Sequence, residues 1–265
     1  MRIAFADQSV PKSGVYVVLV GAGDVMSAPA AAADAELGGA IKRGFSVLGL
    51  KGKTGDMVDL PTPASVGYER LVAVSVGDPA KLDAQAAQNF GGDLYARLAK
   101  GDLKQASIAC AAPEGAALED EVLAAEIAYG FRLAAYRFPK YRTKGPEAKA
   151  PELVSLRMMT ASSAAARRRF GALDRVADGV YMARDLMEEP PNVLYPESFA
   201  KRCEELQELG VEVEVLDEKQ MKKLGMGALL GVAQGSARPA RLVTMRWQGR
   251  KSSAGPLALV GKGVT

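Results

Sequence analysis

The sequence predicts an α/β protein, and three observations carry that prediction. β-Branched runs alternate with alanine-rich stretches of helical spacing through the first half of the chain. Apolar residues make up 48% and charged residues 25%, the balance of a globular protein that can bury a sizeable core. The length of 265 residues exceeds the usual single-domain size, so we expect two domains, or one domain and part of another.

In the first half, two buried strands are predicted. Residues 15–20 (VYVVLV) and 70–76 (RLVAVSV) are β-branched runs that end at Gly21 and Gly77. Alanine-rich segments with helical spacing predict helices over residues 30–43, 82–99 and 120–138.

A solvated connector is predicted over residues 141–152 (YRTKGPEAKAPE), where the composition shifts to lysine, proline and glycine. We therefore place a domain boundary near Pro151, which gives domains 1–150 and 151–265. A short strand over 153–158 and a long helix over 162–187 should follow. The pair Pro190 and Pro191 ends that helix, which we expect to bridge the domains.

The rest of the second half predicts the opening of another α/β domain. Pro196 stands where a helix starts well and Gly210 where one ends, and Asp217 should cap a further helix. Strands are predicted over residues 211–216, 241–247 and 257–260, the last as a buried strand. The resulting order, α-β-α-β-β, is that of an incomplete domain.

The composition excludes several kinds of site. The chain has no histidine, which rules out a Ser-His-Asp or Cys-His mechanism and any imidazole-ligated zinc within it. A metal would need carboxylates, backbone oxygens or an unusual lysine. Cys110 and Cys203 are expected to be reduced and unpaired.

Charge and hydropathy give little support for large charged partners. A net charge of +3, from 34 basic and 31 acidic residues, does not favour nucleic acid or a membrane surface. No apolar stretch is long enough to span a bilayer, and the first residues lack the layout of a signal peptide. We expect a cytoplasmic protein.

Two glycine-rich stretches resemble nucleotide motifs but fail in detail. Gly21 and Gly23 follow a strand, yet Met26 stands where G-x-G-x-x-G requires its third glycine. Gly52, Lys53 and Thr54 imitate the end of a phosphate loop, but the first glycine of that motif would fall on Val47. We interpret both as turns and discard nucleotide binding.

Two charged clusters also have plain interpretations. Consecutive residues spread around a helix, so the basic run 167–169 predicts a solvated helix rather than a phosphate-binding face. The carboxylates of Asp185, Glu188 and Glu189 could hold a hard cation, but carboxylates exposed near a helix end are much commoner.

Lys262 carries the sharpest hypothesis. From spacing alone it is a turn lysine in water, flanked by Gly261 and Gly263. The alternative is a neutral amine bound to a divalent metal, for which the lysine must lose its proton to the cation.

Four blocks of sequence carry a resemblance to a known family. Three lie in the second half: ARDLMEEPPNVLYPESFA (183–200), GMGALLGVAQGSARPARLVTMRWQG (225–249) and LVGKGVT (259–265). YGFRLAAYRFPKYRTK (129–144) is similar to the end of the family's amino-terminal domain. On these residues the chain resembles the leucyl aminopeptidases, also called cytosol aminopeptidases, of the M17 metallopeptidase family.

The resemblance implies a macro-domain-like amino-terminal domain followed by the opening part of an α/β metallopeptidase domain. It further implies peptide substrates, a homo-hexamer and two divalent metal ions, Mn²⁺ or Zn²⁺, in the complete enzyme. The family's GKG lysine binds one metal, and Lys262 is the matching residue, with any substrate contact made through that metal. The family's other ligands and its catalytic lysine and arginine would lie beyond Thr265, so we expect no catalytic residue within this chain and no activity from it alone.

An interpretation from another class stays open. The chain would then be a non-catalytic binding or regulatory module, acting in assembly or nucleic-acid contact. The sequence also departs from the family, which commonly has Asn-x-Pro at positions 188–190 and threonine where Tyr195 stands. Neither departure touches Lys262.

Overall fold

A computed structural model describes residues 1–23, 25–100, 103–145, 153, 155–249 and 255–263. The chain forms two compact units, Met1–Ala183 and Arg184–Thr265. Pro151, near which the boundary was expected, lies outside the described residues. The units divide farther along the chain because residues 155–160 pair into the sheet of the first unit.

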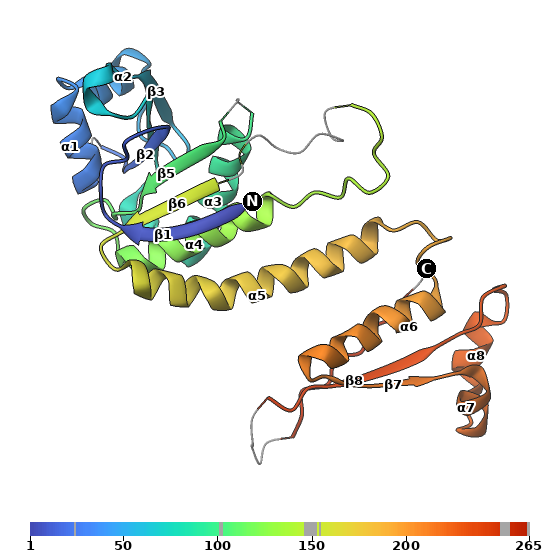
Figure 1. The fold of residues 1–265 in the computed structure, drawn as a ribbon. Coiled ribbons are helices and arrows are strands. Elements are labelled where there is room, and N and C mark those ends of the chain that lie inside the picture. Colours follow the sequence, from blue (N-terminus) through green and yellow to red (C-terminus); the bar gives the residue numbers. More distant parts are fainter. Residues whose placement is uncertain (24, 101–102, 146–152, 154, 250–254, 264–265) are drawn as a thin grey trace. The chain divides into compact units, whose positions relative to one another are not determined.

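The first unit is built on a six-stranded sheet in the order β1-β6-β5-β2-β4-β3 (Figure 1). Its strands are β1 (Arg2–Asp7), β2 (Val15–Val20), β3 (Met57–Pro61), β4 (Arg70–Ser75), β5 (Gln105–Ala109) and β6 (Ser155–Thr160). Neighbouring strands run parallel except β3, which lies antiparallel to β4 at one edge. Every residue of β2 is buried, as its unbroken apolar run predicts for a central parallel strand.

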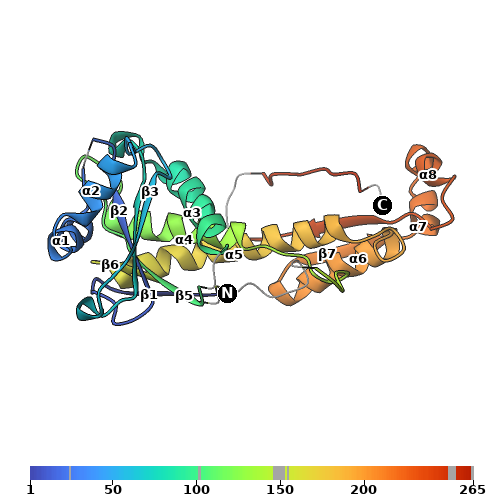
Figure 2. The same cartoon turned by 90° about the horizontal axis from the view of Figure 1, so that it is seen from above.

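Helices cover both faces of this sheet (Figure 2). One face carries α1 (Ala28–Glu36) and α2 (Ala40–Val47), and the other carries α3 (Ala84–Leu98), α4 (Asp120–Ala134) and the start of α5 (Ser163–Glu188). Short 3₁₀ turns lie at Ala64–Val66 (η1) and Pro79–Lys81 (η2). The α/β fold class is therefore confirmed.

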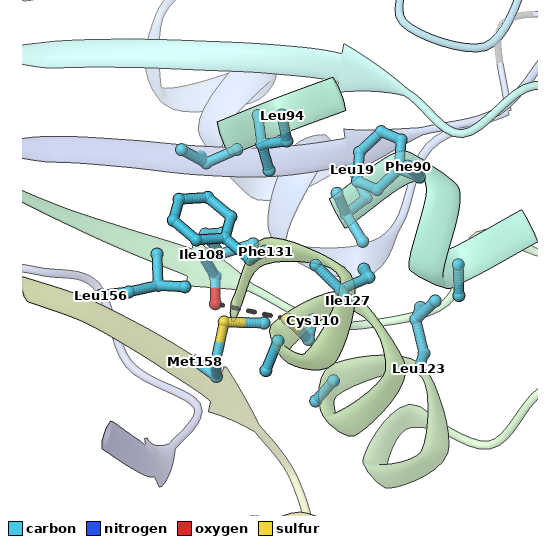
Figure 3. Close-up of a cluster of buried hydrophobic side chains, with 14 of the residues drawn as sticks. Leu19, Phe90, Leu94, Ile108, Cys110, Leu123, Ile127, Phe131, Leu156 and Met158 are labelled. Atoms are coloured by element: carbon cyan, nitrogen blue, oxygen red, sulfur yellow. Dashed lines mark hydrogen bonds between the residues drawn. The ribbon is translucent and has the colours of Figure 1, made fainter. Parts of the chain in front are cut away.

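A close-up of the core shows side chains of β5 and β6 packed against α3 and α4 (Figure 3). Cys110 is fully buried there, and its Sγ lies 3.7 Å from the carbonyl oxygen of Ile108. Burial raises the pKa of the Cys110 thiol, and the nearby Asp120 carboxylate raises it further. Both cysteines are free, as expected.

α3 and α4 cross closely enough to need glycine. A Cβ atom on Gly130 would lie 1.8 Å from the carbonyl oxygen of Gln88, and one on Gly91 would lie 2.1 Å from that of Ile127. These distances are much shorter than van der Waals contact. The backbones of α3 and α4 can therefore lie this close only because both positions are glycine.

The prediction of a single helix over residues 30–43 is wrong, because the structure has two helices there. Gly38 and Gly39 take positive φ angles of 63° and 79° and divide it into α1 and α2. The buried carboxylate of Asp34 accepts hydrogen bonds from the N–H groups of Ile41 (2.8 Å) and Lys42 (3.2 Å), which caps α2. The helical spacing of the apolar residues continues across the break, so spacing alone does not reveal it. The adjacent Gly38 and Gly39 are the feature of the sequence that indicates where the helix is interrupted.

The long helix α5 confirms the prediction over 162–187 almost residue for residue. Its basic run is more than a solvated face. All three arginines are exposed, as predicted, but Arg167 Nη2 also donates to the carbonyl oxygen of Phe5 at 2.8 Å, and Arg169 Nη2 donates to Glu126 of α4 at 2.6 Å. Farther along α5, Arg132 of α4 lies 3.2 Å from both Asp174 and Asp178. These contacts hold α5 against the rest of the first unit.

The second unit contains α6 (Pro196–Glu204), η4 (Glu205–Leu209), β7 (Glu212–Leu216), α7 (Glu218–Lys223), α8 (Gly227–Ala233) and β8 (Leu242–Arg246). β7 and β8 pair antiparallel, and α6 packs against both. Asp217 caps α7 through the N–H of Gln220 at 2.7 Å, as predicted. No helix among the residues described in either unit combines the length and apolarity that crossing a lipid bilayer requires.

Candidate metal-ligand segment and family

The segment that leads to Lys262 is extended and exposed. Residues 255–263 form neither helix nor strand, and Leu257, Leu259 and Val260 are 87%, 89% and 99% exposed. The buried strand predicted over 257–260 is therefore wrong for this chain. A strand needs a neighbour for its backbone groups, and in the described part of the second unit the sheet consists of β7 and β8 alone.

Lys262 itself is exposed. The next residue, Gly263, lies against the ring of Phe199 on α6, where an added Cβ would come 3.1 Å from Cε1. Glycine therefore lets the backbone run close to α6 directly after the lysine.

The start of α6 is held by Ser198 and by a ring contact. Ser198 Oγ accepts from the N–H of Tyr195 at 2.9 Å and donates to the carbonyl oxygen of Val193 at 2.8 Å. The guanidinium of Arg238 lies over the Tyr195 ring, 4.0 Å from its centroid. Tyr195 thus has a stacking role that the family's threonine could not supply. This contact is not predictable from local sequence, because Arg238 is distant along the chain.

The acidic cluster does not form a metal site in the described part of the chain. Asp185 and Glu188 are exposed and Glu189 is half-buried, beside the end of α5. Across the described residues, no three or more His, Cys, Asp or Glu side chains come together in a way that could hold a metal ion. Among the described residues, Lys262 therefore has no cluster of carboxylates beside it that could share a metal ion.

The two glycine-rich stretches are turns, as interpreted. Gly21 donates its N–H to the carbonyl oxygen of Val25 at 2.7 Å, and Gly23 has a φ of 72°. Gly52 has a φ of 71° and lies directly against Ala22. The structure therefore brings the two stretches together, although each fails as a nucleotide motif.

Family models match most of the chain in two blocks. Residues 17–145 match the cytosol aminopeptidase family, N-terminal domain, and residues 181–265 match the cytosol aminopeptidase family, catalytic domain. The two blocks stand in the order that the resemblance implied.

Curated proteins that are similar in sequence along the whole chain belong to the same family. A probable cytosol aminopeptidase of Brucella anthropi is 43% identical over 99% of this chain, and one of Bradyrhizobium sp. is 41% identical over 100%. The chain spans about half the length of these curated relatives, 52% in both cases.

Solved structures share the fold. A mutant of tomato leucine aminopeptidase superposes with a TM-score of 0.78 at 23% identity, covering 92% of this chain and 50% of that one. The bottromycin maturation enzyme BotP in complex with Mn gives 0.66 at 23% identity, covering 88% and 44%. Together, the two family models and the relatives that align along the whole chain place this protein in the cytosol aminopeptidase (M17) family.

Proposed function

We propose that this chain supplies the amino-terminal domain and the first part of the catalytic domain of a metal-dependent aminopeptidase of the leucyl aminopeptidase type. The complete enzyme would release amino-terminal residues from peptides. The observation that carries the proposal is the match of both family domains, in order, along one chain. The names of the relatives support the same activity.

Lys262 is the residue we assign to metal binding. It lies in the sequence GKG, it is exposed, and Gly263 lets the chain continue close to α6. A divalent ion in the complete site would polarise a peptide carbonyl and activate water. Lys262 would offer the lone pair of its neutral amine and would reach the substrate only through the metal.

The described residues alone do not fit two metal ions. They present one exposed lysine and, in those same ranges, no cluster of carboxylates that could share the cations. Hard divalent ions take several oxygen ligands, so further acidic residues must complete the site. We therefore propose that this chain by itself is inactive.

The nature of the metal and the assembly belong to the same proposal. The ions would be Mn²⁺ or Zn²⁺, and the manganese complex of BotP, which shares the fold, supports a divalent metal. The complete enzyme would act in the cytoplasm, in keeping with the relatives' description as cytosol aminopeptidases. It would assemble as a homo-hexamer, which rests on the family resemblance alone.

The test compares the 265-residue chain with a longer protein. Leucine-p-nitroanilide hydrolysis is measured with added Mn²⁺ or Zn²⁺, using protein whose intact mass is 27.8 kDa. A second sample extends the chain past Thr265 with the matching carboxyl-terminal half of the Brucella anthropi relative. Metal-dependent turnover by the extended protein alone is the expected result. Turnover by the 27.8 kDa chain would contradict its proposed inactivity.

A further inference from the structure

A cavity of about 480 Å³ opens in the first unit where β2 and β4 end. Three loops meet around it: the turn after β2 with Ala22, the loop before β3 with Gly52 and Thr54, and the turn after β4 with Gly77. β2 and β4 are parallel, so this is the carboxyl edge of the sheet, where open α/β folds bind their ligands. β3 runs antiparallel to β4, which brings the loop before it to the same edge.

These loops are locked into one arrangement. Ala22 donates its N–H to the carbonyl oxygen of Gly77 at 2.8 Å, which joins the first turn to the third. The buried hydroxyl of Ser75 donates to the carbonyl oxygen of Gly52 at 2.7 Å and accepts from the N–H of Gly77 at 3.0 Å. One side chain therefore ties the second loop to the third.

Glycine is required at both contact points. Gly52 has a φ of 71°, and a Cβ there would lie 2.7 Å from Ala22 Cα. Gly77 has a φ of 83°, and a Cβ there would lie 2.3 Å from Thr54 Oγ1. The stretches Gly21 to Gly23 and Gly52 to Thr54, separate in sequence, thus form one rigid rim.

The rim is cationic. Lys51, Lys53 and Lys81 all line the cavity, and Asp78 is the one acidic residue among the described residues that line it. Asp78 Oδ2 lies 3.5 Å from Lys81 Nζ, so this carboxylate offsets one of the three charges. Nearby Asp56 accepts the backbone N–H groups of Lys51 and Lys53 at 3.2 and 2.9 Å, which fixes the backbone that carries both lysines.

We propose that this pocket binds the diphosphate group of a small anion, either free pyrophosphate or a nucleoside diphosphate. Asp78 offsets one of the three ammonium groups, and the two that remain on the rim suit an anion with at least two charges, whereas a single carboxylate would satisfy only one of them. The volume falls in the range of small-molecule sites. The lining has no aromatic side chain in the described residues on which a nucleic-acid base could stack, which argues against a single-stranded nucleic acid.

The experiment titrates the 265-residue chain by calorimetry at low salt with pyrophosphate, ADP and adenosine. We expect pyrophosphate and ADP to bind one site and adenosine to give no binding. ADP binding as tightly as pyrophosphate assigns recognition to the diphosphate alone, and tighter binding adds a contact to the nucleoside. Absence of pyrophosphate binding, or adenosine binding as tightly as ADP, would overturn the proposal. So would an oligonucleotide that binds more tightly than pyrophosphate.

Variants locate the site. Lys51→Ala and Lys53→Ala should each weaken pyrophosphate binding about three- to tenfold, since each removes one charge at an open site. Lys100→Ala is the matched control, because this exposed lysine follows the opposite end of α3 from Ala86, which lines the cavity. Equal weakening by Lys100→Ala would reveal nonspecific attraction and sink the proposal. In NMR spectra the amides of Gly52 and Gly77 should shift on adding pyrophosphate, and unmoved amides would also contradict it.

Discussion

The guanidinium of Arg169 on α5 donates two hydrogen bonds, of 3.0 and 2.6 Å, to one oxygen of the Glu126 carboxylate on α4. The other oxygen accepts from Gln88 Nε2 on α3 at 2.7 Å. Glu126 is only 2% exposed, so its charge is desolvated and needs both partners. Three helices of one layer therefore meet at a single buried carboxylate.

Arg169→Ala should destabilise the first unit. It removes the cation from a buried carboxylate, and we expect the free energy of unfolding to fall by about 2–4 kcal/mol. Arg168→Ala, one residue away and exposed, should change it by less than about 0.5 kcal/mol. Urea unfolding followed by near-ultraviolet circular dichroism measures both. Equal effects of the two substitutions would show that the ion pair of Arg169 with Glu126 does not add to the free energy of unfolding.

The crossing of α3 and α4 gives a prediction with an internal control. Gly130→Ala places a methyl group 1.8 Å from the Gln88 carbonyl oxygen, and the helices must separate, at a cost of about 3 kcal/mol or more. Gly92→Ala meets its nearest atom at 3.7 Å and should raise stability by about 0.5–1 kcal/mol through helix propensity. Thermal unfolding of both variants tests this, and a stable Gly130→Ala protein would mean that the helices cross less closely.

The position of β6 predicts where the chain can be cut. β6 lies between β1 and β5, so ending the chain at residue 150 removes the one strand that pairs with β1. We expect residues 1–183 to unfold cooperatively as an isolated piece and residues 1–150 to expose the sheet edge and aggregate. Size-exclusion chromatography and urea unfolding compare the two. A monomeric, cooperative 1–150 piece would refute this and would favour the domain boundary near Pro151.

Stability should fall in alkali because of two buried tyrosines. Burial raises the pKa of Tyr16 to about 12, aided by the neighbouring Tyr68, and burial with the Glu36 charge raises the pKa of Tyr68 to about 12. Unfolded tyrosine titrates near 10. The folded state therefore holds its protons more tightly, and stability should be full below pH 10 and lost as the pH rises toward 12.

Urea midpoints and absorbance at 295 nm between pH 8 and 12 measure this loss. Tyr68→Phe should flatten the pH dependence, because it removes one of the two buried hydroxyls that must ionise in alkali. The exposed Tyr141 provides the control, Tyr141→Phe. Titration of all eight tyrosines near pH 10 in the folded protein would disprove the assignment.

The role proposed for Lys262 is tested in the extended protein. Lys262→Arg should be as damaging as Lys262→Ala, lowering turnover by about a hundredfold or more, because a guanidinium stays protonated and offers no lone pair. Lys100→Ala, at an exposed lysine outside both proposed sites, serves as the control with near-parental turnover. Metal content by mass spectrometry and peptidase rate are measured for all three variants. Two metals per subunit and normal turnover in Lys262→Arg would make Lys262 a turn residue.

Local patterns predicted most elements because local energetics determine them. The buried run at β2, the capping residue Asp217 and the proline pair after α5 each act through near neighbours. The failures have nonlocal causes. The strand expected over residues 257–260 has an apolar sequence but no neighbour in the described sheet to satisfy its backbone.

The site shows the same division. The metal role of Lys262 stays a prediction, and it rests on the family resemblance of the contiguous sequence around GKG. The cationic pocket was not predicted, because its loops come from segments around residues 22, 52 and 77 that tertiary structure alone brings together. The same holds for the pairing of Arg169 with Glu126, since each residue by itself has the pattern of an exposed helix position.

The placement of β6 also affects how the chain emerges from the ribosome. β1 is synthesised first, yet its partner strand β6 begins at Ser155. Arg2 therefore cannot pair with Ser155 until most of the first unit has been translated. Until then β5 has an unfilled edge facing the place that β6 will occupy. A nascent chain with such an open edge is a template for wrong pairing. Closure of the sheet by β6 is thus a late, long-range step, and the nascent protein should depend most on chaperones just before residues 155–160 leave the exit tunnel.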